Sequence, residues 1–351
     1  MKLTALKKMM KENNYDYSLI TNSKKINYFT GYTYHPGERF VGLLVSLDSQ
    51  YLIVNHLLNV QEVEGYELIL YYDYQNPLDF VNNIVLDKSI LIDPYIVGEH
   101  LMKLLELNPR LNYQRGSLID TIKAVKNEDE LEILREASLI NDQVMQEVYD
   151  LLRIGISEKE VESFIINRFN EVSSGISFSP IVAFGSNGAD PHASPSNRKL
   201  KENESIVIDM GCIYKGYCSD MTRTFFMGKC DISDVYNLCL KANEEAIKAI
   251  NTTRTFAEID AVARNIISEK GYGDNFNHRL GHGIGRSVHE PFDVSGSNDM
   301  MIKSNMCFSI EPGIYVKDKF GIRIEDLVVS FDDHVEVLNK FPKKLMIKDV
   351  I

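Results

Sequence analysis

Two aspartates embedded in neighbouring apolar segments constrain the fold of this chain most strongly. Asp209 stands in SIVIDMGCI and Asp220 in YCSDMTRTFFM, and the residues Tyr214-Lys215-Gly216 between these segments are typical of a turn. We therefore expect a β-hairpin. With Tyr214 and Lys215 as the turn, Asp209 lies directly opposite Asp220, and both carboxylates leave the same face of the sheet about 5 Å apart.

Two such carboxylates in apolar surroundings repel each other unless cations or hydrogen-bond donors intervene. A solvent-facing hairpin with incidental acids would explain this pair alone, but three further residues favour a metal. They are His282 in GHGIG, Glu311 at the end of the apolar strand MCFSIEP, and Glu325 in GIRIEDL. Two divalent cations would cancel the charge of the four carboxylates, with the imidazole as a neutral ligand. The sequence therefore predicts a dinuclear metal centre.

The chemistry of these donors restricts the choice of metal. Oxygen ligands with a single imidazole favour Mn, Co or Fe(II) over a thiolate-rich structural Zn site, although Zn would still compete. The GHGIG segment lacks the GxGxxG spacing and the strand-to-helix context of a phosphate loop. Arg323 shares strand parity with Glu325, so we expect its guanidinium beside that carboxylate, while Ile322 and Ile324 face the opposite way.

The length of 351 residues suits two domains, and the 44% of hydrophobic residues can fill two cores. An amphipathic helix over residues 3–11 precedes the short strands YSLI, GLLVSL, YLIV, LILYY and SILID, which predicts a small α/β domain. Asn127 and Glu130 then form a capping box that opens a long helix. We place the boundary there, with domains at residues 1–124 and 125–351.

The second domain contains a repeated plan, which predicts an α+β fold. A helix capped by Ser157 and Glu160 leads to the aspartate hairpin. A helix over about residues 233–250 follows, then a helix capped by Thr255 and stopped by Gly271, and then the strands MCFSIEP and IRIEDLVVS. We expect two helix-helix-hairpin halves that face each other. No Pro/Gly-rich linker separates the two domains, which favours a packed interface.

Charge and cysteine usage exclude several classes of partner. The net charge of -12 and the pI of about 5.2 disfavour nucleic acid and anionic membranes. The start of the chain lacks the pattern of a signal peptide, and no apolar run is long enough for a membrane span. Five cysteines without CxxC spacing favour reduced thiols. We therefore expect a cytoplasmic protein.

The ordered motifs DMG, SDMTRT, GHGIGRSVHEP, SIEPGIY and GIRIED resemble those of the pita-bread metallopeptidases, the family of methionine aminopeptidase, aminopeptidase P and Xaa-Pro dipeptidase (prolidase). IKAVKNEDELEILREAS resembles the start of their catalytic domain, and the preceding residues resemble a creatinase-type N-terminal domain. The resemblance implies a pita-bread domain with pseudo-twofold halves and a homodimer. It also implies two metal ions held by Asp209, Asp220, His282, Glu311 and Glu325, with Asp220 and Glu325 bridging them.

The same resemblance implies roles for side chains in the cleft. A hydroxide that bridges the two ions would attack the peptide bond, and Glu311 would shuttle the proton. His289 in VHEP would stabilise the carbonyl oxygen, and His192 in NGADPHASPSN would contact the residue after the scissile bond. Arg323 would either orient Glu325 or bind the carboxylate of a dipeptide.

Some positions leave questions open. His35 in TGYTYHPGERF would lie near the cleft of a partner subunit, while a plain surface loop is the alternative. Arg286 replaces an aliphatic residue common in relatives, and the PFDVSG stretch after His289-Glu290 also departs from the family pattern. Both departures leave open which substrate side chain the cleavage site prefers.

The implied function is hydrolysis of Xaa-Pro dipeptides, with short proline-containing peptides as substrates. The alternative is an aminopeptidase P, which removes the first residue from longer X-Pro peptides. A non-catalytic pita-bread binding protein is a third reading, but such relatives typically lose ligands and this chain keeps all five. A creatinase-type hydrolase without metal has no use for four converging carboxylates.

Overall fold

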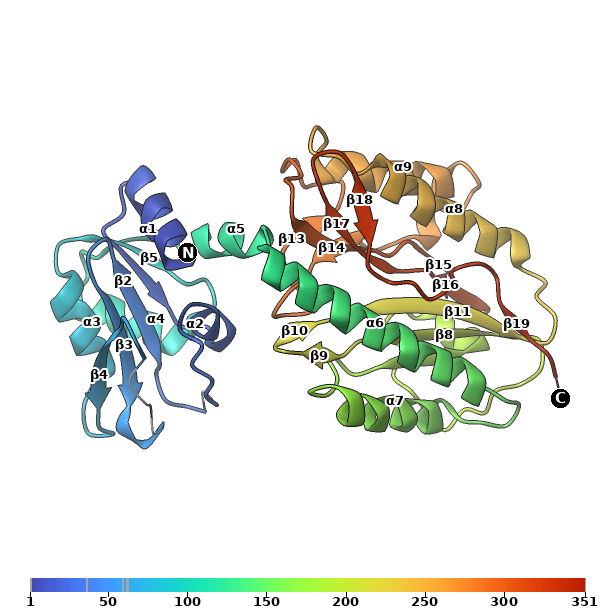
Figure 1. Cartoon of the computed structure of the whole chain (residues 1–351), viewed down its shortest axis with the longest axis horizontal. Helices are drawn as coiled ribbons and strands as arrows, with labels where there is room; N and C mark the ends of the chain where they lie inside the picture. Colours follow the sequence, from blue (N-terminus) through green and yellow to red (C-terminus); the bar gives the residue numbers. More distant parts are fainter. Residues whose placement is uncertain (1, 36, 59, 61–62, 351) are drawn as a thin grey trace. The chain divides into compact units, whose positions relative to one another are not determined.

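The computed structural model describes residues 2–35, 37–58, 60 and 63–350. The chain forms two compact units, Met1–Lys123 and Ala124–Ile351, each with its own core (Figure 1). The second unit begins three residues before Asn127, the residue that caps the long helix. No helix among the described residues has the length and apolar character needed to cross a membrane.

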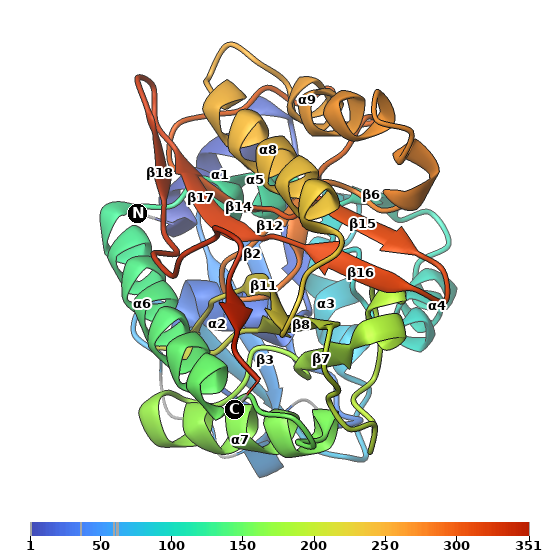
Figure 2. The same ribbon diagram turned by 90° about the vertical axis from the view of Figure 1, so that its right-hand side faces the viewer.

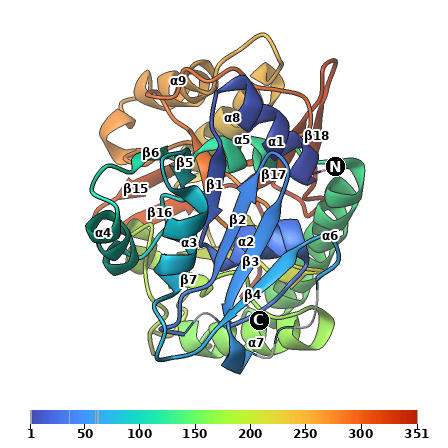
Figure 3. The same cartoon turned by 90° about the vertical axis from the view of Figure 1, so that its left-hand side faces the viewer.

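The first unit is built on a six-stranded mixed sheet with the order β4-β3-β2-β1-β5-β6 (Figure 3). β2 pairs antiparallel with β1 and β3, and the other neighbours are parallel. Five of the strands correspond to the predicted apolar segments. The sixth, β6, was missed because its four residues are all exposed and lack apolar alternation. The strands are β1 (Tyr17–Ile20), β2 (Gly42–Ser46), β3 (Gln50–Asn55), β4 (Glu67–Tyr71), β5 (Ser89–Ile92) and β6 (Asn112–Arg115).

Helices cover both faces of this sheet, because successive strand residues alternate between two cores. Leu19 and Leu44 pack with residues of α3 and α4, whereas Ile20 and Leu43 pack with residues of α1, α2 and α5. The short 3-10 helix η1 (His56–Leu58) follows β3. The helices are α1 (Lys2–Glu12), α2 (Ser23–Thr30), α3 (Pro77–Val85), α4 (Gly98–Leu107) and α5 (Leu118–Ala124), the last of which ends at the division between the units.

The first half of the second unit packs two helices on a four-stranded sheet with the order β19-β11-β8-β7. Both helices begin at the predicted capping boxes, formed by Asn127 with Glu130 and by Ser157 with Glu160. The apolar faces of these helices and strands share one core. The elements are α6 (Glu128–Leu151), α7 (Glu158–Val172), β7 (Ile181–Phe184), η2 (Gly185–Ala189), β8 (Glu204–Met210), β11 (Met221–Met227) and β19 (Ile347–Lys348).

The second half repeats this plan, as predicted. Its two helices cover a five-stranded sheet, β13-β12-β14-β17-β18, and the two-stranded sheet β15-β16 (Figure 2). Thr255 and Glu258 form the expected capping box. The elements are α8 (Ser233–Ala249), α9 (Phe256–Ser268), η3 (Gly273–Asn275), β12 (Gly281–Gly283), β13 (Glu290–Val294), β14 (Met306–Ile310), β15 (Gly313–Val316), β16 (Phe320–Arg323), β17 (Asp326–Ser330) and β18 (Val335–Val337).

The two halves are joined where β11 lies beside β16 and the residues that follow it. The amide of Glu325 donates to the carbonyl oxygen of Thr222 at 3.1 Å. The hydroxyl of Thr224 accepts from the amide of Arg323 at 3.0 Å and donates to its carbonyl oxygen at 2.9 Å. Residues that are distant in the sequence are thus hydrogen-bonded to each other where the two halves meet.

The predicted register of the aspartate hairpin is wrong by two residues. Asp209 lies opposite Thr222, not opposite Asp220. The short strands β9 (Ile213–Tyr214) and β10 (Tyr217–Cys218) pair Tyr214 with Tyr217, so the turn residues are Lys215 and Gly216. Both have positive φ, 47° and 80°, which suits a tight hairpin turn. Because the slip is an even number of residues, the expected face of the sheet is retained.

The five cysteines are free in the structure, as the sequence predicted, and four of them are buried.

Candidate metal centre

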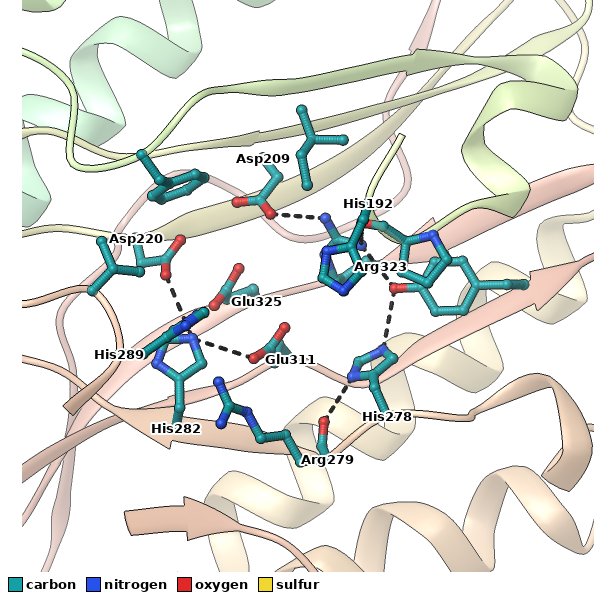
Figure 4. A pocket seen from close by; sticks show the side chains of 15 residues that line it. His192, Asp209, Asp220, His278, Arg279, His282, His289, Glu311, Arg323 and Glu325 are labelled. Carbon is teal, nitrogen blue, oxygen red and sulfur yellow. Dashed lines mark hydrogen bonds and ion pairs between the residues drawn. The ribbon is translucent and has the colours of Figure 1, made fainter. Parts of the chain in front are cut away.

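All five predicted ligands line one cavity of about 490 Å³ in the second unit (Figure 4). The hairpin of the first half contributes Asp209, at the end of β8, and Asp220, just before β11. The second half contributes the other three. His282 lies in β12, Glu311 directly follows β14, and Glu325 lies between β16 and β17.

Three of these side chains converge most closely. One ligand atom from each of Asp220, His282 and Glu325 lies within 4.8 Å of the others. Nε2 of His282 is 3.6 Å from Oδ2 of Asp220 and 3.4 Å from Oε1 of Glu311. The imidazole therefore stands between carboxylates from both halves.

Two buried carboxylate oxygens of this cavity lack a hydrogen-bond partner among the described residues. They are Oδ1 of Asp209 and Oε1 of Glu325. A buried acceptor without a partner costs about 1–3 kcal/mol, and more when it is charged. Hard oxygen donors of this kind, with one imidazole, suit divalent cations, so the residues fit the metal group that the sequence predicts.

The protonation of these groups follows from their crowding. Burial, followed by repulsion from neighbouring carboxylates, raises the pKa of Asp220 and of Glu325 well above the ordinary values. Burial also raises the pKa of Glu311 to about 7. Burial lowers the pKa of His282 to about 3, which keeps its imidazole neutral and able to act as a ligand. Cations would reverse the shifts of the carboxylates.

Arg323 faces the cavity together with Glu325, but its guanidinium pairs with a different carboxylate. Nη2 of Arg323 donates to Oδ2 of Asp209 at 2.8 Å, and Nη1 donates to the hydroxyl of Tyr315 at 2.8 Å and to the carbonyl oxygen of Pro191 at 3.3 Å. The residue is buried. Arg323 thus orients Asp209 directly, which the sequence did not predict.

Thr222 connects Arg323 to Glu325. Its hydroxyl accepts from Nε of Arg323 at 3.0 Å and donates to Oε2 of Glu325 at 2.7 Å. Sequence reasoning missed this residue, although its position two residues after Asp220 in SDMTRT puts both side chains on one face of a strand.

A second set of contacts reaches Arg323 through the hydroxyl of Tyr315. The hydroxyl of Tyr315 lies 3.2 Å from Nε2 of His278, whose Nδ1 is 2.7 Å from the carbonyl oxygen of Arg279. Burial lowers the pKa of His278 to about 4. Neither Tyr315, the last residue of the motif SIEPGIY, nor His278 was identified from the sequence, because no local pattern indicates that either side chain contacts Arg323 or its partners.

Of the other residues predicted for the cleft, two line the cavity and one lies in the first unit. His192 and His289 line the cavity and are exposed, and the ring of His289 meets that of His282 edge to face at 4.3 Å between centroids. His35 is exposed in the loop after α2 of the first unit.

The loop that carries His289 is anchored by a buried ion pair. Nζ of Lys126 donates to Oε2 of Glu290 at 3.0 Å, and both side chains are almost inaccessible. The amide of Arg286 donates to Oε1 of the same carboxylate at 3.1 Å. Arg286 also stacks on the ring of Tyr217, so it supports the loop from outside the cavity lining.

Comparison with known proteins agrees with this arrangement. Residues 132–330 match the model of Metallopeptidase family M24, and residues 2–125 match that of the Creatinase/Prolidase N-terminal domain. An uncharacterized peptidase of Staphylococcus epidermidis is 35% identical over 355 aligned positions, which cover 97% of this chain and 99% of that protein.

Solved structures resemble the whole chain. A dipeptidase from Pyrococcus horikoshii superposes with a TM-score of 0.93 at 34% identity, covering 99% of this chain and 100% of that one. An Xaa-Pro dipeptidase from Bacillus anthracis gives a TM-score of 0.90 at 28% identity, covering 99% of each chain. Further similar structures include prolidases and an X-Pro aminopeptidase.

These matches confirm the predicted fold class and family resemblance. The chain combines a creatinase-type N-terminal domain with a pita-bread domain, and it belongs to Metallopeptidase family M24.

Proposed function

We propose that this protein is an Xaa-Pro dipeptidase that works with two divalent cations, Mn or Co before Fe or Zn. Asp209, Asp220, His282, Glu311 and Glu325 would hold the ions. The observation that carries the proposal is the convergence of four carboxylates and a neutral imidazole on one cavity, with two carboxylate oxygens left without a protein partner. When bound, the ions would lower the pKa of water to about 7 and supply hydroxide at neutral pH.

The remaining groups of the cavity suit the proton transfers and the charge that hydrolysis requires. Glu311 keeps its side chain 16% accessible at the cavity surface, where it would take a proton from water and deliver it to the leaving nitrogen. His289 would stabilise the carbonyl oxygen as it becomes negative. His192 would contact the residue after the scissile bond.

Specificity for proline fits the apolar part of the cavity. Phe178, Ile181 and Val288 line it beside the ligands. A proline after the scissile bond presents a ring and no N–H, so an apolar wall can hold it without an acceptor left unpaired. The named activities of similar structures, Xaa-Pro dipeptidase and prolidase, support the same substrate class.

An aminopeptidase P activity is the second candidate, because an X-Pro aminopeptidase from Thermotoga maritima is also similar to this chain. Kinetics with Leu-Pro and Leu-Pro-Gly would separate the two. A dipeptidase cleaves the first and hardly the second, and an aminopeptidase P shows the reverse preference.

The test of the function uses Asp220→Asn and Glu325→Gln, with Glu132→Gln on an exposed position of α6 as the control. After chelation and reloading with Mn or Co, the wild type and the control should cleave Leu-Pro and contain two ions per chain by elemental analysis. The two site variants should be inactive while keeping the circular dichroism of the wild type. Activity that survives in either variant, or a wild type without metal-dependent cleavage of any X-Pro peptide, would overturn the proposal. The homodimer and the cytoplasmic location stay predictions.

A further inference from the structure

Arg279 is a cationic residue of the cavity that the proposed chemistry does not use. It lies three residues before His282, and its side chain is 31% accessible. Its Nη1 donates to Oδ1 of Asp293. No described residue accepts a hydrogen bond from its Nε or Nη2. Figure 4 shows the guanidinium extending towards His282 and Glu311.

The other guanidinium in the lining of this cavity, that of Arg323, is already engaged. Arg323 is buried and spends its donors on Asp209, Thr222, Tyr315 and the carbonyl oxygen of Pro191. Both ring nitrogens of His278 have partners. Arg323 therefore cannot receive a substrate carboxylate without breaking the contacts that orient the metal ligands.

Asp293, the partner of Arg279, is positioned by the pairing of its own strand. In the pairing of β12 with β13, Asp293 lies directly opposite His282, and the register then shifts so that Gly283 faces Glu290. Phe292, within this bulge, has φ of 128°, a conformation that a bulky side chain rarely adopts. Strain of this kind is retained where surrounding structure holds it, often at functional sites. The bulge lies in the PFDVSG stretch that follows Glu290.

Arg279 lines the same cavity as His282, His289 and Glu311 (Figure 4). The guanidinium is therefore close to the place where the peptide bond would be cleaved.

We propose that Arg279, held by Asp293, binds the C-terminal carboxylate of a dipeptide substrate. In Xaa-Pro, only three bonds separate the scissile carbonyl carbon from the carboxylate carbon, so the group that receives the carboxylate must stand beside the metal centre. Nε and Nη2 form one edge of the guanidinium and match the two oxygens of a carboxylate. Longer peptides have an amide at that position, which offers no charge and one oxygen. The residue would thus select dipeptides.

This inference rests on the proposed function, and the experiment separates the two. The substrates are Leu-Pro, its C-terminal amide and Leu-Pro-Gly, and the variants are Arg279→Gln and Arg279→Lys. Arg153→Gln, at an exposed position outside the cavity, is the control because it removes the same charge. The wild type should prefer Leu-Pro over its amide by about 10- to 100-fold in kcat/KM. Arg279→Gln should lower kcat/KM for Leu-Pro more than that for the amide, so that the variant no longer distinguishes the two substrates.

A binding measurement that needs no turnover completes the test. Calorimetry with the metal-loaded protein should show that proline binds more tightly than prolinamide, and that Arg279→Gln removes the difference. Arg279→Lys should keep part of it, because the charge remains and the paired donors do not. Equal losses with acid and amide substrates, or a wild type that does not distinguish proline from prolinamide, would overturn the role of Arg279. If the wild type cleaves none of the peptides, the proposed function fails, and the calorimetric comparison alone decides the role of Arg279.

Discussion

A single hydroxyl group, that of Thr222, joins a guanidinium to a metal-site carboxylate. It satisfies Nε of Arg323 and Oε2 of Glu325 at the same time. Side chains that hydrogen-bond to metal ligands fix the orientation of those ligands. Their removal typically lowers metal affinity or activity about 10- to 100-fold.

Thr222→Val retains the β-branched shape and removes the hydroxyl. We expect Mn affinity or kcat/KM for Leu-Pro to fall about 10- to 100-fold, while Thr222→Ser stays near the wild type. Isothermal titration with Mn and steady-state kinetics measure this. The control is Thr121→Val at an exposed position. Equal behaviour of Thr222→Val and the control would contradict the role of Thr222.

At this scale the sequence identifies the five residues that converge on the cavity, but not the side chains that hold them in place. Asp209, Asp220, His282, Glu311 and Glu325 stand in recognisable motifs, and all five line the cavity. Thr222, Tyr315 and His278 are recognisable only when strands from both halves are placed side by side. That placement depends on tertiary hydrogen bonds that no local pattern encodes.

Burial of His278 makes the stability of the metal-free protein depend on pH. Its pKa is about 4 in the folded chain, against an ordinary value of 6.5. Between these two pKa values the unfolded chain binds more protons than the folded chain. The contribution of the neutral His278 ring to the free energy of unfolding is therefore complete above pH 6.5 and is lost as the pH falls towards 4. Between pH 7 and 5 the loss is about 2 kcal/mol in the free energy of unfolding.

Urea unfolding of the chelated protein at several pH values measures this loss. His278→Gln should show a shallower dependence between pH 7 and 5 than the wild type. Identical slopes would show that His278 does not carry the effect.

Among the elements, the β9-β10 turn decides the register of the site. Lys215 and Gly216 at positive φ shift the pairing of β8 and β11 by two residues from the simplest hairpin. Local signals predicted the helices well, because the capping boxes at Asn127, Ser157 and Thr255 are satisfied within one turn of chain. Register was harder, since Tyr-Lys and Lys-Gly are both available as turn residues and the two choices bury the same face.

Gly216→Ala tests this turn. The φ of 80° strains a side chain even though the position is open, so we expect a loss of about 1 kcal/mol in stability. Gly98→Ala is the matched control, because that glycine begins α4, has ordinary φ and has open space around it. Chemical unfolding of both variants gives the comparison. A loss that is no larger for Gly216→Ala than for the control would contradict the strained turn.

For the molecule as a whole, the candidate metal centre lies between two halves with separate cores. The first half supplies two of its carboxylates, and the second supplies the other two carboxylates and the imidazole. Ions bound by both halves would stabilise the folded chain by mass action, since the unfolded chain does not assemble the site.

Adding Mn to the chelated protein should therefore raise its melting temperature. At a free concentration of 100 times Kd, one site contributes about 2.7 kcal/mol. Asp220→Asn should lose most of this increase, and Glu132→Gln should keep it. Differential scanning calorimetry measures both, and an equal increase in Asp220→Asn would contradict metal binding at this site.

The pairing of Arg323 with Asp209 would make the two proposed cation positions unequal. The positive charge on the side of Asp209 is that of Arg323, which is buried, whereas the charge that extends towards His282 and Glu311 is that of Arg279, which is 31% accessible and therefore more strongly screened by solvent. Electrostatic repulsion would weaken the position beside Arg323. We expect loading in two steps, with the ion nearest Asp209 arriving last and leaving first on dilution.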